Sequence, residues 1–267
     1  MSITSVDDIA AGLAASQSVD FIRILTAPKA AGAFQSGWMA TGNPGPGVAS
    51  PAYTAGAGYA CSSATAGAMR YNNAAVQNWL ARLAMACSQP GTIILYDRLW
   101  SCSGMGFAAG TFAVTTPGAL PARITDNGVD VEAWVEQFVA AGAASGTLTL
   151  NYLNANTGAA KSGVISAVVS APVAGQLQPI PVAAGDTGVR SIVSVVTSAT
   201  WTSGSFGITL MKTLARVTVI GSGLGQTLDW AGTGLAKIPA DACIMAIFLA
   251  QGTTAPTIIG TMDIIDK

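Results

Sequence analysis

The sequence predicts a mainly β protein: a two-sheet antiparallel β-sandwich of the jelly-roll type, with a short N-terminal helix, a Gly/Pro-rich arm and one further helix. The first observation behind this prediction lies beyond residue 90, where short apolar and β-branched stretches alternate with clusters of Gly, Pro, Asn and Asp, as strands alternate with turns. The second is their number, roughly nine, which is close to the eight strands of a jelly roll. The chain shows no solenoid or propeller repeat.

At the N-terminus, the sequence predicts a helix followed by a strand. Ser5 and Asp8 match the S-x-x-D capping box, and apolar residues then recur on one helical face. Residues 19–25 are β-branched and aromatic, which indicates a strand, and Pro28 ends it.

Residues 30–69 are crowded with glycine and proline and show no periodicity. A stretch of about 35–40 residues without regular elements is unusual in a compact domain and is typical of a functional loop, a disordered segment or an arm. Its aromatic residues argue against disorder. We therefore expect the Gly/Pro tract, residues 42–58, to be an arm whose backbone and tyrosines find partners on a neighbouring subunit.

A second helix is predicted over residues 74–88. Asn72 or Asn73 would cap it, and Pro90 follows its end. Its apolar face comprises Val76, Trp79, Leu80, Leu83 and Cys87.

The remaining chain is read as strands near residues 92–100, 111–116, 129–139, 147–153, 162–170, 189–197, 206–220, 242–250 and 257–265. In the third of these, apolar residues alternate with Asp130, Glu132 and Glu136, which predicts a half-buried strand with one solvated face. The turn-rich residues 154–158 predict a hairpin between the fourth and fifth. The change of pattern divides the chain into an N-terminal mixed region, 1–90, and a β-sandwich domain, 91–267.

Charged residues make up only 9% of the chain, against about 25% in soluble domains. The surface is therefore expected to consist of small polar side chains or to be covered by other subunits, which favours an obligate assembly. The net charge of −1 provides no basic stripe for nucleic acid. No apolar run approaches the roughly 18–20 residues of a membrane-spanning helix.

The N-terminus lacks the basic and apolar regions of a secretory signal, which predicts synthesis in the cytoplasm. In that reducing compartment the scattered cysteines are expected to be buried free thiols. They are Cys61, Cys87, Cys102 and Cys243.

The chain contains no histidine. Ser-His-Asp and Cys-His catalysis and His-ligated zinc are therefore excluded, and we predict no catalytic, cofactor-binding or metal-binding residues. Glu132 and Glu136 are the two glutamates. Four positions apart on a strand, they would lie about 13 Å from each other, beyond the roughly 5–9.5 Å of paired glycosidase carboxylates. A solvated strand face is the preferred interpretation.

Two short motifs invite a catalytic or cofactor interpretation. Asp186-Thr187-Gly188 matches the D-T-G triplet of aspartic proteases, although a second triplet is absent. An ordinary turn entering the strand at Val189 is preferred, and a homodimer that supplies the second aspartate is the alternative. Residues 221–225, Gly-Ser-Gly-Leu-Gly, depart from G-x-G-x-x-G and precede no helical pattern, so a hairpin or loop is expected.

Six tryptophans are spread along the chain, and packing is preferred over stacking on sugars because none lies among clustered polar side chains. They are Trp38, Trp79, Trp100, Trp134, Trp201 and Trp230.

Several stretches resemble structural proteins from the head-gene modules of tailed bacteriophages. These are residues 5–14, the Gly/Pro/Ala tract 42–67, residues 94–104, Thr115-Thr116-Pro117-Gly118 and the strand with Glu132-Ala133-Trp134. None is a diagnostic motif, and the resemblance carries over no functional residues.

The resemblance implies a non-enzymatic decoration or cement protein on the capsid surface of the virion, with a jelly-roll body, assembled as a homotrimer and bound to the major capsid protein. A tail-tube, baseplate or fibre component is the main alternative, and a glycan-binding or glycan-cleaving virion protein is the competing class. In this interpretation the N-terminal 90 residues supply arms or a docking surface.

Overall fold

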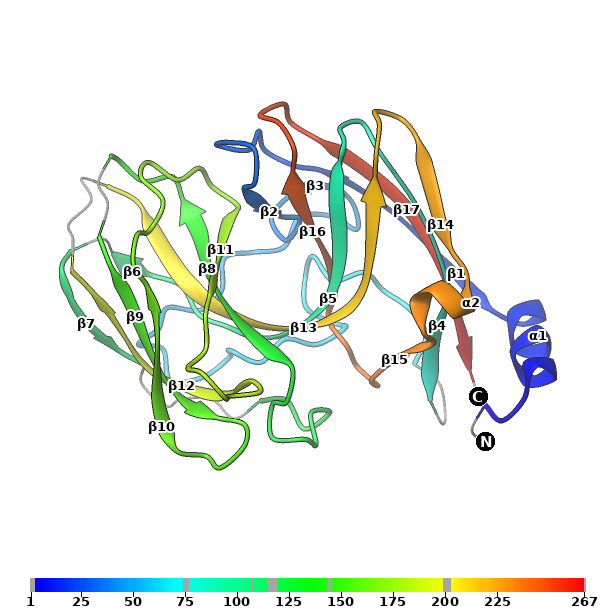
Figure 1. Ribbon diagram of the computed structural model, residues 1–267, viewed down its shortest axis with the longest axis horizontal. Helices are drawn as coiled ribbons and strands as arrows, with labels where there is room; N and C mark the ends of the chain where they lie inside the picture. The colour runs from blue at the N-terminus through cyan, green and yellow to red at the C-terminus, as the bar shows by residue number, and fades with distance from the viewer. Residues whose placement is uncertain are drawn as a thin grey trace. The chain divides into compact units, whose positions relative to one another are not determined.

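The computed structural model describes residues 3–73, 77–106, 108–114, 120–143, 146–198 and 203–266. As predicted, the described chain is mainly β, with antiparallel sheets in a sandwich-like arrangement and two helices (Figure 1). It divides into two compact units. Unit 1 comprises Met1–Val48, Ser62–Asp97 and Leu214–Lys267, and unit 2 comprises Ala49–Cys61 and Arg98–Thr213.

Residue 90 lies inside unit 1, in the turn between its strands β4 and β5, and both units contain chain from either side of this position. The compact units therefore interleave in sequence. A functional division at residue 90 stays a prediction.

Unit 1 contains a six-stranded antiparallel sheet in the order β14-β4-β17-β1-β3, with β15 also paired to β4 (Figure 1). Its strands are β1 (Gln17–Ile24), β3 (Thr41–Asn43), β4 (Asn78–Cys87), β14 (Gly225–Leu228), β15 (Ala236–Ile238) and β17 (Thr257–Asp266). A second layer pairs β16 (Ile244–Ala250) with β2 (Phe34–Ser36) and β5 (Gly91–Ser101). The final part of β13 (Ser205–Val219) also belongs to unit 1.

The core of unit 1 lies between these layers. Phe21, Leu83 and Met262 from the first sheet belong to one buried cluster with Ile93 and Phe248 from the second. Each of these side chains is at most 2% exposed. Alternate residues of β1, β4 and β17 thus form one wall of an apolar interior, which is the main contribution to stability in such a sandwich.

The predicted helix over residues 74–88 is wrong, because this stretch forms β4 (Asn78–Cys87), while residues 74–76 lie outside the described ranges. Buried side chains of a strand normally recur every second residue. In β4 the register against β17 shifts between Arg82 and Leu80, which leaves one extra residue in the strand. The bulge gives Leu80, Leu83 and Cys87 the spacing of three and four that is typical of a helix.

Unit 2 contains two four-stranded antiparallel arrays, β10-β9-β12-β7 and β11-β8-β13-β6. Their strands are β6 (Met105–Gly106), β7 (Gly110–Ala113), β8 (Val131–Val139), β9 (Leu148–Asn154), β10 (Ala160–Ile165), β11 (Gln176–Ile180), β12 (Val189–Thr197) and the first part of β13. A second core cluster, which includes Leu150, Tyr152, Val195 and Ile208, takes residues from both arrays.

Most of the predicted strands are confirmed. The strand at 189–197 has the predicted bounds, and β5, β8, β9, β13, β16 and β17 differ from their predicted ranges by no more than two residues at either end. The predicted hairpin is also confirmed, since β9 and β10 pair in continuous register. The strand predicted at 162–170 ends at Ile165. In the strand predicted at 111–116, β7 ends at Ala113 and residues 115–116 lie outside the described ranges.

The N-terminal helix is confirmed as α1 (Val6–Ala14), with both hydrogen bonds of the Ser5–Asp8 capping box present. The second helix is the short α2 (Trp230–Thr233), whose start is capped by Asp229. Neither helix in the described ranges has the length and apolarity needed to span a membrane.

Parts of the Gly/Pro tract are hydrogen-bonded within the chain, and contact of the tract with a neighbouring subunit stays a prediction. Arg23 is fully buried and donates from its guanidinium to the carbonyl oxygens of Pro44 at 2.7 Å and of Ala40 and Gly45 at 3.2 Å, and also to that of Gly67. Burial lowers the pKa of Arg23 to about 10. A single cation thus holds the start of the tract beside β1.

The later part of the tract is held within unit 2. The Tyr53 amide donates to the Ser103 carbonyl at 2.8 Å, and the Tyr59 hydroxyl donates to the carbonyl oxygens of Ala52 and Tyr53. These tyrosines thus have hydrogen-bond partners within the chain, whereas the expected partners on a neighbouring subunit stay a prediction.

Candidate functional site

Asp186 lies in the turn before β12, as the preferred interpretation of the D-T-G triplet expected. Its Oδ2 accepts from the Tyr152 hydroxyl at 2.5 Å and its Oδ1 accepts from the Asn154 side-chain amide at 2.8 Å. Hydrogen bonds from Asn154 and Tyr152 lower the pKa of Asp186. Burial and the Asp186 hydrogen bond raise the pKa of Tyr152 to about 12.

This arrangement is the opposite of a protease dyad. A pair of aspartates that shares a proton raises one pKa, whereas donors on both oxygens keep Asp186 ionised. Within the described chain, no second carboxylate is hydrogen-bonded to it. The carboxylate therefore fastens the turn to strand β9.

Glu136 corrects the expectation of a solvated strand face. It is 1% exposed and, together with Gln137 and Phe138, lies in a stretch of β8 that is buried on both faces. Its Oε2 accepts from Arg98 at 2.7 Å and from the Thr209 hydroxyl at 2.6 Å. The alternation in β8 correctly indicated a strand. It could not indicate that residues distant in sequence, such as Arg98 and Thr209, bury the polar face of this strand.

The Arg98 guanidinium is fully buried and also donates to the hydroxyl groups of Ser101 at 2.7 Å and Ser50 at 3.2 Å. The Ser101 and Thr209 hydroxyl oxygens lie 2.9 Å apart. Arg98 and Glu136 thus form a closed, buried ion pair with hydroxyl partners. We interpret this pair as structural, because both charged groups are buried and neither is accessible to a ligand.

Glu132 is half-buried and accepts from the Thr213 hydroxyl at 3.0 Å and from the Trp134 indole at 3.2 Å. These hydrogen-bond partners differ from those of Glu136, which are Arg98 and Thr209.

The Gly-Ser-Gly-Leu-Gly stretch is a loop, as predicted. Gly223 donates to the Cys87 carbonyl at 2.8 Å and the Ser222 hydroxyl donates to the Ser88 carbonyl at 2.6 Å. Strand β14, not a helix, follows it. The tryptophans also favour packing: Trp38, Trp100 and Trp134 are at most 3% exposed, while Trp201 lies outside the described residues.

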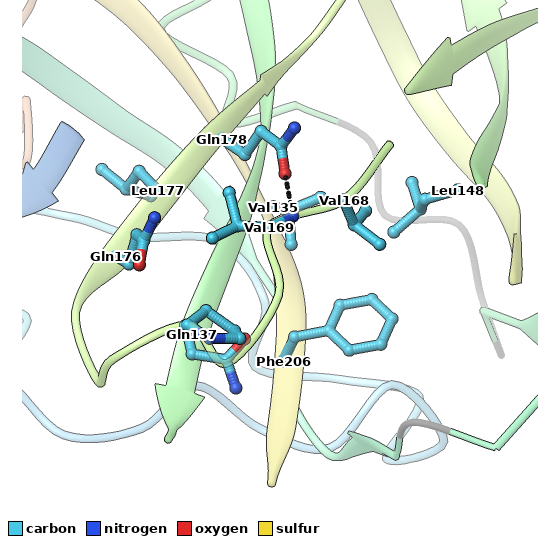
Figure 2. A pocket seen from close by; sticks show the side chains of 10 residues that line it. Val135, Gln137, Leu148, Val168, Val169, Gln176, Leu177, Gln178 and Phe206 are labelled. Atoms are coloured by element: carbon cyan, nitrogen blue, oxygen red, sulfur yellow. Dashed lines mark hydrogen bonds between the residues drawn. The ribbon is translucent and has the colours of Figure 1, made fainter. Parts of the chain in front are cut away.

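Figure 2 shows a small cavity in unit 2, lined by apolar side chains such as Val135, Leu148 and Phe206 and by three glutamines. Its volume of about 20 Å³ holds roughly one water molecule. Gln178 accepts from the Val169 amide at 3.2 Å and donates to the Ala167 carbonyl at 3.0 Å. The Gln178 side-chain amide is therefore hydrogen-bonded to the loop before β11 through both its oxygen and its nitrogen.

A larger hollow of about 310 Å³ lies beside β8 and the turn before β12 and is bordered by Asp130, Glu132 and Asp186. Glu132 and Asp186 already accept hydrogen bonds from neighbouring side chains. In the described ranges, no group of three or more His, Cys, Asp or Glu side chains is placed to hold a metal ion. The four cysteines are free and buried, and burial raises the pKa of Cys102 to about 12.

The outer side of the β10-β9-β12-β7 sheet carries uncharged side chains at the positions in regular register. The inward residues of these strands form the unit 2 core, so the register places the alternate residues outside. Two charged residues lie on these strands, and both are exposed. Lys161 is opposite inward-facing Tyr152, and Arg190 lies at the bulge between Val189 and Ser191, opposite outward-facing Leu153. The outward residues, which we call the neutral face, are Thr111, Ala113, Thr149, Asn151, Leu153, Ala160, Ser162, Val164, Ser194 and Val196.

Hydrogen bonds tie the middle of the neutral face together. The Ser162 hydroxyl donates to the side-chain Oδ1 of Asn151 at 2.8 Å, and the side-chain Nδ2 of Asn151 donates to the Ser194 hydroxyl at 2.9 Å. Val164 is 48% exposed at the edge of the face. A folded surface usually carries about 25–35% charged residues, so this face is suited to contact with another protein.

No protein-family model and no curated protein matches the chain. Among solved structures, the VP2 subviral particle of infectious bursal disease virus is similar at 9% identity over 94% of this chain and 80% of that chain, with a TM-score of 0.24. A protein of unknown function from Shewanella oneidensis MR-1 is similar at 12% identity over 73% of this chain and 90% of that chain, with a TM-score of 0.14. Scores of this size do not establish a shared fold.

Proposed function

We propose that the chain is a non-enzymatic structural protein of a tailed-phage virion, a decoration or cement protein that stabilises the head shell. The observation that carries the proposal is the neutral face of unit 2, on a chain with only 9% charged residues. A surface of this kind associates without the cost of desolvating charges.

The side-chain chemistry supports a structural role. The sequence has no histidine, and the acidic groups that carry chemistry elsewhere are engaged here as hydrogen-bond acceptors, Glu136 with Arg98 and Asp186 with Tyr152. Each interaction stabilises a turn or a strand pair. These engaged acidic groups and the low charge fraction support a structural role over an active site.

For the assembly, we propose a homotrimer that contacts the major capsid protein at the capsid surface. The neutral face is the proposed contact between copies. The N-terminal 90 residues, which include α1 and the Gly/Pro tract, are the proposed docking surface toward the shell.

Cryo-electron microscopy of virions from the phage that encodes the chain tests this proposal. We expect trimeric density on the outside of the head shell that fits the two β units, with the N-terminal residues toward the shell. Density on the tail, baseplate or fibres would replace the decoration role with another structural role. The absence of the chain from purified virions, or its binding to surface polysaccharide with turnover, would contradict the proposal.

A further inference from the structure

Strand β1 has an open edge over its first half. β3 pairs only with Ile22–Ile24, whereas β17 pairs with the whole strand from Gln17 to Ile24. The side of β1 that faces away from β17 is therefore without a partner strand before Ile22. Figure 1 shows this region of β1 next to β17, near α1.

The backbone groups on this open edge can be assigned from the register. Leu25, directly after β1, donates its amide to the Pro256 carbonyl on the β17 side at 3.0 Å. Because backbone groups in an antiparallel ladder alternate between the two sides, the N–H and C=O groups of Ser18 and Asp20 point to the open side. Among the described residues they have no hydrogen-bond partner, and exposed groups of this kind are templates for another strand.

A groove of about 470 Å³ runs along this edge, between β1 on one side and the segment from Met69 to Asn72 on the other. At one end, the Gln17 side-chain amide donates to the Asn72 carbonyl at 2.8 Å and accepts from the Asn72 amide at 2.7 Å. The Gln17 amide thus makes the two hydrogen bonds that a peptide group would make there.

We propose that this groove, which we call the β1 groove, binds an extended peptide segment of a neighbouring protein subunit by strand addition to Ser18 and Asp20. Strand addition takes affinity from main-chain hydrogen bonds and specificity from alternate side chains. The lining favours small, uncharged residues in the segment, because hydroxyl and amide groups dominate it and its charges, Asp20 and Arg70, are of opposite sign.

A peptide fits these features better than a saccharide. The open groups form a row of alternating donors and acceptors from Ser18 to Asp20, which matches the repeat of a strand. The aromatic residue of the lining, Tyr71, packs against the unit 1 core, and its hydroxyl is bonded to the Pro239 carbonyl and the Ala242 amide. Because the Tyr71 ring packs against the core, it is poorly placed to stack on a sugar.

The test is hydrogen exchange measured by NMR on the full chain, with a capped octapeptide of alternating threonine and valine as the probe. In the free protein, the amides of Ser18 and Asp20 should exchange fast, while those of Val19 and Phe21, which face β17, are protected. The peptide should slow exchange at Ser18 and Asp20 by about tenfold or more, as pairing protects an open strand edge. A peptide with alternate N-methylated backbone groups should have no effect.

Ser18→Pro removes one open donor and fills the edge, and proline is tolerated where a strand N–H faces solvent. Its far-UV circular dichroism should match the parent, and the peptide should no longer protect Asp20, whereas Ser18→Ala should bind as the parent does. Protection that is absent in the parent, equal with the N-methylated peptide, or retained in Ser18→Pro would overturn the proposal. Protection by a disaccharide in place of the peptide would also overturn it.

Discussion

At the scale of single residues, the chain uses its few charges in two different ways. Arg98 and Glu136 are buried together at 2.7 Å, with side chains at most 2% exposed. Arg82 and Asp263 form an equally close pair at 2.6 Å, but the Arg82 side chain is 50% exposed. In the second pair solvent screens the exposed Arg82, and the Asp263 side chain, which is only 8% exposed, also accepts a hydrogen bond from the Ser18 hydroxyl at 2.6 Å. Loss of Arg82 should therefore have a small effect on stability, whereas the first pair depends on both members being present.

Arg98→Met should lower the free energy of unfolding by about 3–5 kcal/mol, because Glu136 is left as an unpaired buried charge. The double variant Arg98→Met, Glu136→Leu should recover much of this loss, since no charge remains. Urea denaturation measures both. Arg82→Met is the matched control, with an expected loss of about 0–1 kcal/mol. Equal losses for Arg98→Met and Arg82→Met would show that the buried pair has no special role.

Tyr152 should make the stability depend on alkaline pH. Its pKa is raised from 10.0 to about 12 in the folded chain, so the folded state holds the proton more tightly than the unfolded state. The associated stability is present below about pH 10 and is lost as the pH rises toward about 12. Thermal unfolding across this range should show a decline in the parent that is smaller in Tyr152→Phe. Identical pH profiles for the two proteins would refute the assignment.

At the scale of elements, the sequence predicted those whose residues contact each other locally or alternate without interruption. The Ser5–Asp8 capping box and the uninterrupted alternation of β9 are of this kind. The bulge in β4 gave the buried residues of a strand the spacing of a helix, so the strand was predicted as a helix. The short strands β2, β3, β6, β11, β14 and β15 were not predicted, because two to five residues show no measurable period and depend on partners distant in sequence.

The candidate site was less predictable than the fold. The sequence correctly predicted turns at Asp186 and at residues 221–225, because turn residues act locally. It missed the burial of Glu136 and the neutral face, since both depend on register between strands. The β1 groove could not be foreseen either, because the short β3 that leaves its edge open was itself not predicted.

Arg23 should control the order of the Gly/Pro tract. Arg23→Met removes the donors to the carbonyl oxygens of Pro44 and Gly45, so residues 41–47 should become sensitive to a broad-specificity protease. Arg23→Lys should restore protection only in part, because an ammonium cannot match the planar fork of donors. Limited proteolysis with mass spectrometry locates the cuts, and Arg82→Met is the control. An uncut tract in Arg23→Met would show that other contacts hold it.

At the scale of the whole molecule, two β units share a chain that carries very little charge. Each unit has its own core, so stability does not require a partner in the way that an incomplete sandwich does. We propose that association is instead favoured by the neutral face, whose residues in regular register are uncharged. Each unit therefore folds by burying its own apolar core. In our proposal, assembly depends separately on the neutral face.

Sedimentation equilibrium of the parent and of Val164→Lys tests this central claim most directly. Val164 is 48% exposed, so lysine is tolerated by the fold but places a charge on the neutral face. Thr254→Lys, in an exposed turn, is the matched control. The account predicts the mass of three chains for the parent and for Thr254→Lys, and a shift toward one chain for Val164→Lys. A parent that sediments as a single chain at every concentration, or a Val164→Lys variant that remains trimeric, would contradict it.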